Sequence, residues 1–388
     1  MSNSSAKESR LPVLGINSLG RIGKLTLWHH VNRKYFKEII VNQGRDIGMG
    51  METIARLIEA DATYGLLHRF LYGIPVTVLR EQRNPMNIPW RQYGADIVVD
   101  CSGSFKDPTV PVDDKKGSIR GHLNGGAKAV IHSAPFKIKN KALSTPEDTT
   151  TLIYGINHTA FNPKKHLLIS AASCTTTGLA HMVKPLLDNK ETSTILTASM
   201  STIHAVTNTQ SVLDKLPKAG EKDIRKTRSI LNNIILTSTG AAKALAEVIP
   251  EVKNIGFMGD SIRVPTNTLS LIVLNATFQA RNNDKAAAAG LDTKKLNDIY
   301  AKAAQDNPLV RFTMQQNVST DLIGEDAAVI IEGQFNHTRT AFIPVDLSHI
   351  PNLPADLVSS LGEKMLQVPV VHAKIFGWYD NEYGSYTN

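Results

Sequence analysis

The chain has little cysteine and few aromatic residues. Among its 388 residues, Cys101 and Cys174 are the two cysteines, and phenylalanine, tryptophan and tyrosine together make up 6%. Two cysteines cannot build a disulfide framework, so the sequence fits a reducing compartment and predicts a cytoplasmic protein. Basic and aromatic residues are not interleaved as in RNA-binding motifs, so nucleic-acid binding is not indicated.

Long apolar runs and clustered charge are missing as well. No uncharged span is long enough to cross a membrane, and the polar first ten residues lack the apolar core of a secretory signal. We expect residues 1–10 to be a disordered leader, and we predict neither membrane association nor a metal site. The formal net charge of +8 favours anionic ligands such as phosphates. A length of 388 residues favours two domains.

Strands and helices alternate in the first part of the chain. A strand at 13–16 runs into Asn17-Ser18-Leu19-Gly20-Arg21-Ile22-Gly23 and a helical pattern. This turn resembles the dinucleotide fingerprint with Ser18 in place of its first glycine, although an ordinary strand–helix turn explains it equally well. Further strands are expected at 38–41, 76–79, 96–101 and 128–132, and a helix at 51–61. We therefore predict an α/β fold whose first domain, residues 11–173, is of the Rossmann nucleotide-binding type.

Longer strands in succession follow. They are expected at 194–202, 268–278, 327–335, 338–344 and 368–376, with helices at 241–248 and 296–304 covering one face. This pattern predicts a second, α+β catalytic domain over residues 174–380, built on a mostly antiparallel sheet.

Cys174 lies where an apolar strand at 167–169 gives way to an amphipathic helix. A sulfur in the first helical turn meets unpaired backbone N–H groups and the positive end of the helix dipole, which favours the thiolate. Taken alone, such a cysteine is more often a small apolar residue under a helix. A strand rich in threonine and isoleucine delivers His204, however, and a cysteine nucleophile needs such a base.

Five segments together resemble phosphorylating glyceraldehyde-3-phosphate dehydrogenase, and they occur in that family's order. They are Ser173-Cys174-Thr175-Thr176, His204-Ala205-Val206-Thr207, Ser238-Thr239-Gly240-Ala241-Ala242-Lys243-Ala244, Arg263-Val264-Pro265-Thr266 and Trp378-Tyr379-Asp380-Asn381-Glu382. The resemblance implies an enzyme of glucose metabolism that oxidises and phosphorylates glyceraldehyde 3-phosphate through a thioester on Cys174, with His204 as base. It also implies a homotetramer, with the basic segment 210–228 at an interface. In the family a final helix follows the last segment, so residues 381–388 are expected to be the start of a truncated C-terminal helix.

Binding roles are implied by the same resemblance. The substrate phosphate is expected on Thr207, Thr209 and Arg263, and inorganic phosphate on Ser173, Thr175, Arg228, Thr239 and Gly240. NAD or NADP is expected on Asn17, Gly20, Arg21, Ile22, Gly23, Gln43, Ser102, Gly103, Ser133 and Asn381.

Gln43 is an informative departure from the family, which usually has aspartate there. NAD-selective Rossmann folds present a carboxylate to the ribose hydroxyls, and that carboxylate repels a 2′-phosphate. Gln43 removes the repulsion and Arg45 follows closely, so we expect NADP to be tolerated. The alternative for Arg45 is that it merely solvates a loop.

Two other functions stay open at this point. The substrate could be erythrose 4-phosphate, which is one hydroxymethylene unit longer. The departures at Ser18, Gln43 and Thr177 also fit an impaired paralogue that acts as a nucleotide-responsive interaction protein.

Overall fold

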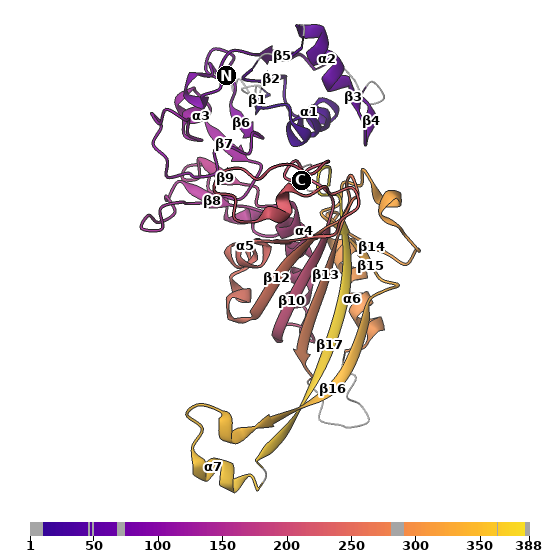
Figure 1. The fold of residues 1–388 in the computed structure, drawn as a ribbon. Coiled ribbons are helices and arrows are strands. Elements are labelled where there is room, and N and C mark those ends of the chain that lie inside the picture. Colours follow the sequence, from indigo (N-terminus) through magenta and orange to yellow (C-terminus); the bar gives the residue numbers. More distant parts are fainter. Residues whose placement is uncertain are drawn as a thin grey trace, which may run out of the picture. The chain divides into compact units, whose positions relative to one another are not determined.

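The computed structural model describes residues 11–45, 47–48, 50–67, 74–280, 291–362 and 364–384 (Figure 1). The predicted leader, residues 1–10, lies outside the described residues, as do residues 385–388 of the expected C-terminal helix. The chain divides into two compact units, one of Met1–Cys174 with Glu382–Asn388 and one of Thr175–Asn381. No helix among the described residues is long and apolar enough to span a membrane.

The first unit is built on a parallel sheet with the strand order β5-β2-β1-β6-β7-β9-β8. All of its neighbouring strands run parallel. This confirms the predicted Rossmann-type α/β architecture. The strands are β1 (Val13–Asn17), β2 (Glu38–Asn42), β5 (Val76–Leu79), β6 (Ile97–Asp100), β7 (Ala129–His132), β8 (Thr149–Thr151) and β9 (Leu168–Ser170), and the helices are α1 (Arg21–Arg33), α2 (Met51–Glu59) and α3 (Gly121–Asn124).

Both faces of this sheet are buried, because successive side chains of its apolar strands point to opposite faces. Leu14 and Ile16 pack in one cluster with Leu27 and Val31 of α1. Val13, from the same strand, packs on the other face in a cluster that contains Trp90. This fully buried strand ends at Asn17, so the fingerprint turn begins at a rigid edge.

One helix of the first unit is shorter than the sequence predicted. α2 ends at Glu59, and Ala60–Asp61 instead form β3, which pairs with β4 (Gly65–Leu66). The Asp61 carboxylate accepts the N–H groups of Thr63 and Tyr64, and it pairs with Lys24 at 2.7 Å. These local bonds hold a turn where the periodicity alone suggested two more helical residues.

The second unit contains a larger, mixed sheet with the strand order β11-β12-β10-β13-β17-β15-β14. β10 runs parallel to β12, and β14 to β15, while the other pairings are antiparallel. The strands are β10 (Ile195–His204), β11 (Ile235–Ser238), β12 (Gly256–Arg263), β13 (Ser270–Gln279), β14 (Val310–Thr313), β15 (Val329–Glu332), β16 (His337–Asp346) and β17 (Met365–Tyr379), and the helices are α4 (Cys174–Asp188), α5 (Ala241–Val248), α6 (Thr293–Asp306) and α7 (Ala355–Ser360).

β17 is longer than predicted and includes Trp378 and Tyr379. It pairs with β13 from Val370 to Tyr379 and with β16 from Met365 to Lys374, so its middle part is paired on both sides. Figure 1 shows β16 and β17 continuing together as a two-stranded ribbon to α7. The strands β11, β12 and β14 were not predicted, because short or glycine-interrupted segments such as Gly256–Arg263 carry little alternation. The strand β12 matters for the site, because it brings Arg263 beside His204.

Candidate active site

In the fingerprint turn, Ser18 adopts a backbone conformation that favours glycine. Its φ is 85°, in the left-handed region that favours glycine, and its N–H donates to the Asn42 carbonyl at 2.7 Å. Gly23 packs so closely behind it that a Cβ would lie 1.9 Å from the Ser18 carbonyl oxygen. The turn therefore keeps the geometry of the dinucleotide fingerprint although the first glycine is missing.

A cavity of about 850 Å³ opens beside this turn. Its lining includes four predicted cofactor residues from the turn and the ends of β2 and β6, namely Asn17, Gly20, Gln43 and Ser102. Phe105 adds an aromatic side chain that could face a base. The structure therefore brings these predicted residues around one space large enough for the adenosine part of a dinucleotide.

Asp100, at the end of β6, organises the polar groups beneath this cavity. It accepts the Asn17 amide at 3.1 Å, and both the N–H and the hydroxyl of Ser102, at 3.0 and 2.7 Å. Trp90 donates to Nδ1 of His122, so the other ring nitrogen of His122 carries the proton that faces Asp100 at 2.9 Å. Burial alone would raise the pKa of Asp100, but its hydrogen-bond donors outweigh burial and hold the pKa well below the usual range. The ionised carboxylate therefore fixes Asn17 and Ser102.

The other predicted cofactor residues of the first unit follow the same strand ends. Gly103 has a φ of 64°, and Ser133 donates its N–H to the Asp100 carbonyl at 3.1 Å. Arg21 is turned away to Asp61 and Glu382, and its Nη2 lies 2.5 Å from Glu382. This side chain therefore ties the segment after residue 381 to the first unit, and Ile22 and Gly23 follow it in the first turn of α1.

Cys174 is the first residue of α4. The chain enters this helix through Ala172, whose φ is 59° and whose N–H donates to the Ser170 hydroxyl at 3.1 Å. Ser173 lies between this bend and the cysteine. This confirms that a strand, a sharp bend and a helix start place the sulfur in the first turn, where backbone N–H groups favour an anion.

Tyr379 links the first turn of α4 to the strand that carries His204. Its hydroxyl lies 2.9 Å from Thr175 Oγ1 and 2.7 Å from Thr202 Oγ1, and all three side chains are buried. Its ring meets the His204 ring edge to face at 6.0 Å. The sequence placed Tyr379 in a motif but gave it no role.

His204 is 4% exposed and ends β10. Its Nδ1 lies 2.7 Å from the Ala205 carbonyl oxygen, and Arg263 Nη1 lies 2.5 Å from this nitrogen and 2.9 Å from the same carbonyl. Burial lowers the pKa of His204 to about 4, and the Arg263 charge adds to the decrease. At neutral pH the imidazole is therefore uncharged and able to accept a proton.

Ser270 connects this corner to the residue predicted to orient nicotinamide. It accepts the Ala205 N–H at 3.1 Å and donates to Asn381 Oδ1 at 2.8 Å. With its oxygen held in this way, the Asn381 amide nitrogen has a fixed direction. Sequence reasoning identified Asn381 and missed Ser270, which lies outside the recognised motifs.

The residues predicted to bind phosphates fall into separate groups. The Thr207 and Thr209 hydroxyls lie 2.9 Å apart in the segment after β10, whose last residue, His204, pairs with Arg263 of β12. Thr239 accepts the Ala241 N–H at the start of α5, beside Gly240. The strand register pairs Ile235 with Arg263 and Ser238 with Asp260, which puts Thr239 beyond the opposite end of the β11–β12 pair. Arg228 is exposed and pairs with Asp214 at 3.1 Å.

Within the described part of the chain, no cluster of three or more histidine, cysteine, aspartate or glutamate side chains is placed to hold a metal ion. Cys101 and Cys174 are not joined by a disulfide. Burial raises the pKa of Cys101 to about 12, and the Asp100 charge adds to the increase, so this thiol, which directly follows β6, stays protonated.

Two family models match the chain. Residues 13–108 match the glyceraldehyde 3-phosphate dehydrogenase NAD binding domain, and residues 173–345 match the C-terminal domain of the same family. A glyceraldehyde-3-phosphate dehydrogenase from Streptomyces coelicolor is 32% identical over 394 aligned residues, covering 97% of this chain and 95% of the relative. One from Chlamydia pneumoniae is 34% identical over 325 residues, covering 82% and 87%. Glyceraldehyde-3-phosphate dehydrogenase 1 from Bacillus cereus is 30% identical over 384 residues, covering 97% and 95%.

Proposed function

This chain belongs to the glyceraldehyde-3-phosphate dehydrogenase family, and from that premise we propose that Cys174 is its nucleophile and His204 its base. The protein is an oxidoreductase, a phosphorylating dehydrogenase that uses NAD(P). The assignment of the two residues rests chiefly on the buried Thr175–Tyr379–Thr202 link, because it holds Thr175, the residue that follows Cys174 in the chain, beside the strand that delivers His204.

The described residues fit a dinucleotide. The cavity beside the fingerprint turn takes the adenosine part, and Asp100 holds Asn17 and Ser102 in place around it. Ser133 and Asn381 are the residues for the nicotinamide part, where the bound cofactor would accept a hydride. Arg21 contributes by anchoring Glu382, the residue that follows Asn381.

The chemistry then needs three contributions from this chain and one from inorganic phosphate. The Cys174 thiolate adds to the aldehyde carbon, and His204 takes the hydroxyl proton of the resulting hemithioacetal as a hydride leaves that carbon. The backbone N–H of Cys174 stabilises the oxygen of the intermediate. Inorganic phosphate attacks the thioester, which releases an acyl phosphate and restores the thiolate.

For the two phosphates, we place the substrate phosphate at Thr207, Thr209 and Arg263, and inorganic phosphate at Ser173, Thr175, Thr239 and Gly240. Arg228 joins the second group once its exposed pair with Asp214 is exchanged for the anion, since an exposed ion pair contributes little stability.

Glyceraldehyde 3-phosphate is the proposed aldehyde, and erythrose 4-phosphate is the alternative. Purified protein should be compared on both aldehydes by initial rates of NAD(P)H formation with phosphate present. A larger kcat/KM for erythrose 4-phosphate would replace the first substrate by the second. Absence of aldehyde-dependent NAD(P)H formation with either substrate would favour the impaired paralogue.

We also propose a homotetramer that works in the cytoplasm. The basic segment 210–228 exposes Leu213 by 72% and Leu216 by 90%, and Ile234, just before β11, and Met258, in β12, are exposed by more than 70%. Exposed large apolar side chains are typical of surfaces that contact another subunit. Sedimentation should give a tetramer for the wild type and smaller species for Leu216→Asp. A monomeric wild type at working concentrations would contradict the proposal.

A further inference from the structure

The charged side chains that line the cavity beside Gln43 are all positive among the described residues. Its lining includes four cationic side chains, Arg45, Arg83, Lys115 and Lys116, and no carboxylate among the residues that the structure describes. These cations come from the loop after β2, from the segment after β5 and from the loop after β6. Three separate segments therefore bring positive charge to one edge of the space that fits adenosine.

Gln43 points back to the fingerprint turn. Its Oε1 accepts the Leu19 N–H at 3.1 Å, so its side-chain oxygen has a structural task and its amide nitrogen can only donate. An aspartate at this position would present an acceptor to both ribose hydroxyls and would repel a 2′-phosphate. Here the end of β2 supplies a donor instead.

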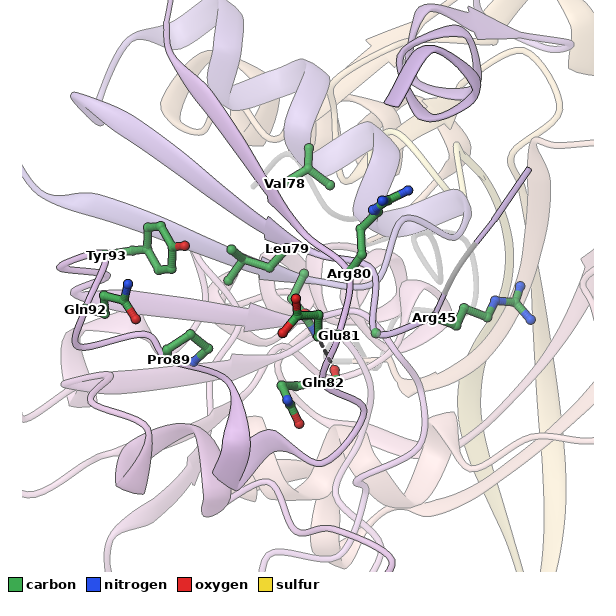
Figure 2. A pocket seen from close by; sticks show the side chains of 11 residues that line it. Arg45, Val78, Leu79, Arg80, Glu81, Gln82, Pro89, Gln92 and Tyr93 are labelled. Atoms are coloured by element: carbon green, nitrogen blue, oxygen red, sulfur yellow. Dashed lines mark hydrogen bonds between the residues drawn. The ribbon is translucent and has the colours of Figure 1, made fainter. Parts of the chain in front are cut away.

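A second cavity, also of about 850 Å³, shares Asn42, Gly44, Arg45 and Gln82 with the first (Figure 2). It is lined in addition by Glu81, so a phosphate there would meet a carboxylate. Figure 2 shows the Arg45 guanidinium extending away from Gln92 and Tyr93 on the far side of this cavity. The space beside Gln43 is thus the better receiver for a dianion.

The acidic residues nearest in sequence to the lysine pair are Asp113 and Asp114. The Asp114 carboxylate accepts the Lys116 N–H at 2.8 Å, and its carbonyl is within 3.5 Å of the Asn84 amide. Asp114 therefore shapes the loop that carries the lysines, and neither aspartate lines the cavity.

We propose that Arg45, Arg83, Lys115 and Lys116 form a subsite for the 2′-phosphate of NADP, so that this enzyme binds NADP more tightly than NAD. The inference rests on the proposed function for the identity of the whole cofactor, but the subsite itself needs only the adenosine end. Gln43 permits the phosphate by lacking charge, and the four cations attract it.

Binding of two fragments tests the subsite without any catalysis. Titration calorimetry should give a dissociation constant for 2′,5′-ADP at least about tenfold lower than for 5′-AMP, since charge-assisted bonds to a dianion exceed that difference of about 1.4 kcal/mol. The advantage should shrink as salt is raised. Equal affinities for the two fragments would overturn the proposal.

Variants separate charge from folding. Lys115→Met with Lys116→Met should remove most of the preference for 2′,5′-ADP and leave 5′-AMP affinity unchanged. Lys141→Met, an exposed lysine that does not line the cavity, is the matched control and should alter neither. An unchanged preference in the double variant, with a melting temperature like that of the wild type, would contradict the assignment of the two lysines.

Gln43→Glu is the sharpest single change, because glutamate keeps the length and the acceptor for Leu19 while adding negative charge. It should weaken 2′,5′-ADP about tenfold or more and affect 5′-AMP little. If the fragments behave as expected but no aldehyde-dependent NAD(P)H is formed, the reaction assignment fails and the subsite stands. If catalysis with NAD is normal but 2′,5′-ADP is not preferred, the reaction assignment stands and the subsite fails.

Discussion

The two regions expected to bind phosphate groups differ in how their cations are engaged. At the nucleotide end of the first unit, four cationic side chains line a cavity whose described lining residues include no carboxylate. In the second unit, Arg263 lies against His204 and the Ala205 carbonyl, and Arg228 pairs with Asp214. On the proposed assignments, an anion would enter the first region without displacing a partner that the structure describes, whereas in the second region the phosphates would have to displace partners that Arg263 and Arg228 already have. The affinity of the second region for a phosphate group therefore depends on the contacts that Arg263 and Arg228 must break to bind it.

The largest expected effect separates chemistry from nucleotide binding. Cys174→Ser should abolish turnover, because a serine hydroxyl in the same helical turn is far less acidic and less nucleophilic than a thiol. Fragment binding at the cavity beside Gln43 should be unchanged, as should the melting temperature. Measurable steady-state turnover by this variant, free of wild-type contamination, would contradict the role of Cys174.

His204→Asn should cost less, about 10²- to 10⁴-fold in kcat, since it removes the base and leaves the helix start that favours the thiolate. The readout is kcat for both cofactors, with iodoacetamide labelling to show that Cys174 remains reactive. His349→Asn, which replaces an exposed histidine of the same unit, is the control and should behave like the wild type. An unchanged kcat in the His204→Asn enzyme would exclude His204 as the base.

Several of the elements that build these two regions could be predicted from the sequence. The fingerprint turn, the helix after Cys174 and the strand before His204 follow from local periodicity, because each depends on residues near one another in the chain. Tyr379, Ser270 and Asp100 were missed as organising residues because each has partners far away in sequence. Thr202 and Tyr379, for example, are 177 positions apart. Local patterns carry no information on such pairs.

The four cations were missed for the same reason. Arg83 and the Lys115–Lys116 pair lie in loops whose charges read as solvated surface, and only the parallel sheet brings those loops together. The direction of Arg263 was equally hidden. Its motif indicated phosphate binding, while its contact with His204 depends on β12, a strand that the sequence did not reveal.

Arg263→Gln tests the second region directly. It should raise KM for the phosphorylated aldehyde and lower kcat/KM by about 10- to 100-fold, because a charge-assisted bond is lost. Removing the charge should also raise the pKa of His204 from about 4. Burial remains, so the new value should stay below the usual 6.5, and the acid limb of the pH–rate profile should move upward.

The same variant should change stability in acid. With its pKa lowered, folded His204 binds fewer protons than the unfolded chain between about pH 6.5 and 4, so its contribution to stability is lost as pH falls through that window. Arg263→Gln should reduce this loss, and Arg339→Gln, at an exposed arginine of the same unit, should not. Identical acid denaturation curves for Arg263→Gln and wild type would show that Arg263 does not act on His204.

The smallest expected effect concerns Ser18 in the first region, because its backbone adopts a conformation that favours glycine. Ser18→Gly should raise the free energy of unfolding by about 1 kcal/mol, because a φ of 85° is strained for serine and not for glycine. Ser144→Gly, at an exposed position outside the residues with positive φ, should instead lower stability slightly through chain entropy. Denaturant unfolding of both variants compares their free energies of unfolding with that of the wild type.

The Ser18 N–H bond to Asn42 is a backbone bond, so the Ser18→Gly variant keeps it. Fragment affinities at the cavity should therefore stay as in the wild type. A destabilised Ser18→Gly would show that the serine side chain, and not the backbone, holds this turn.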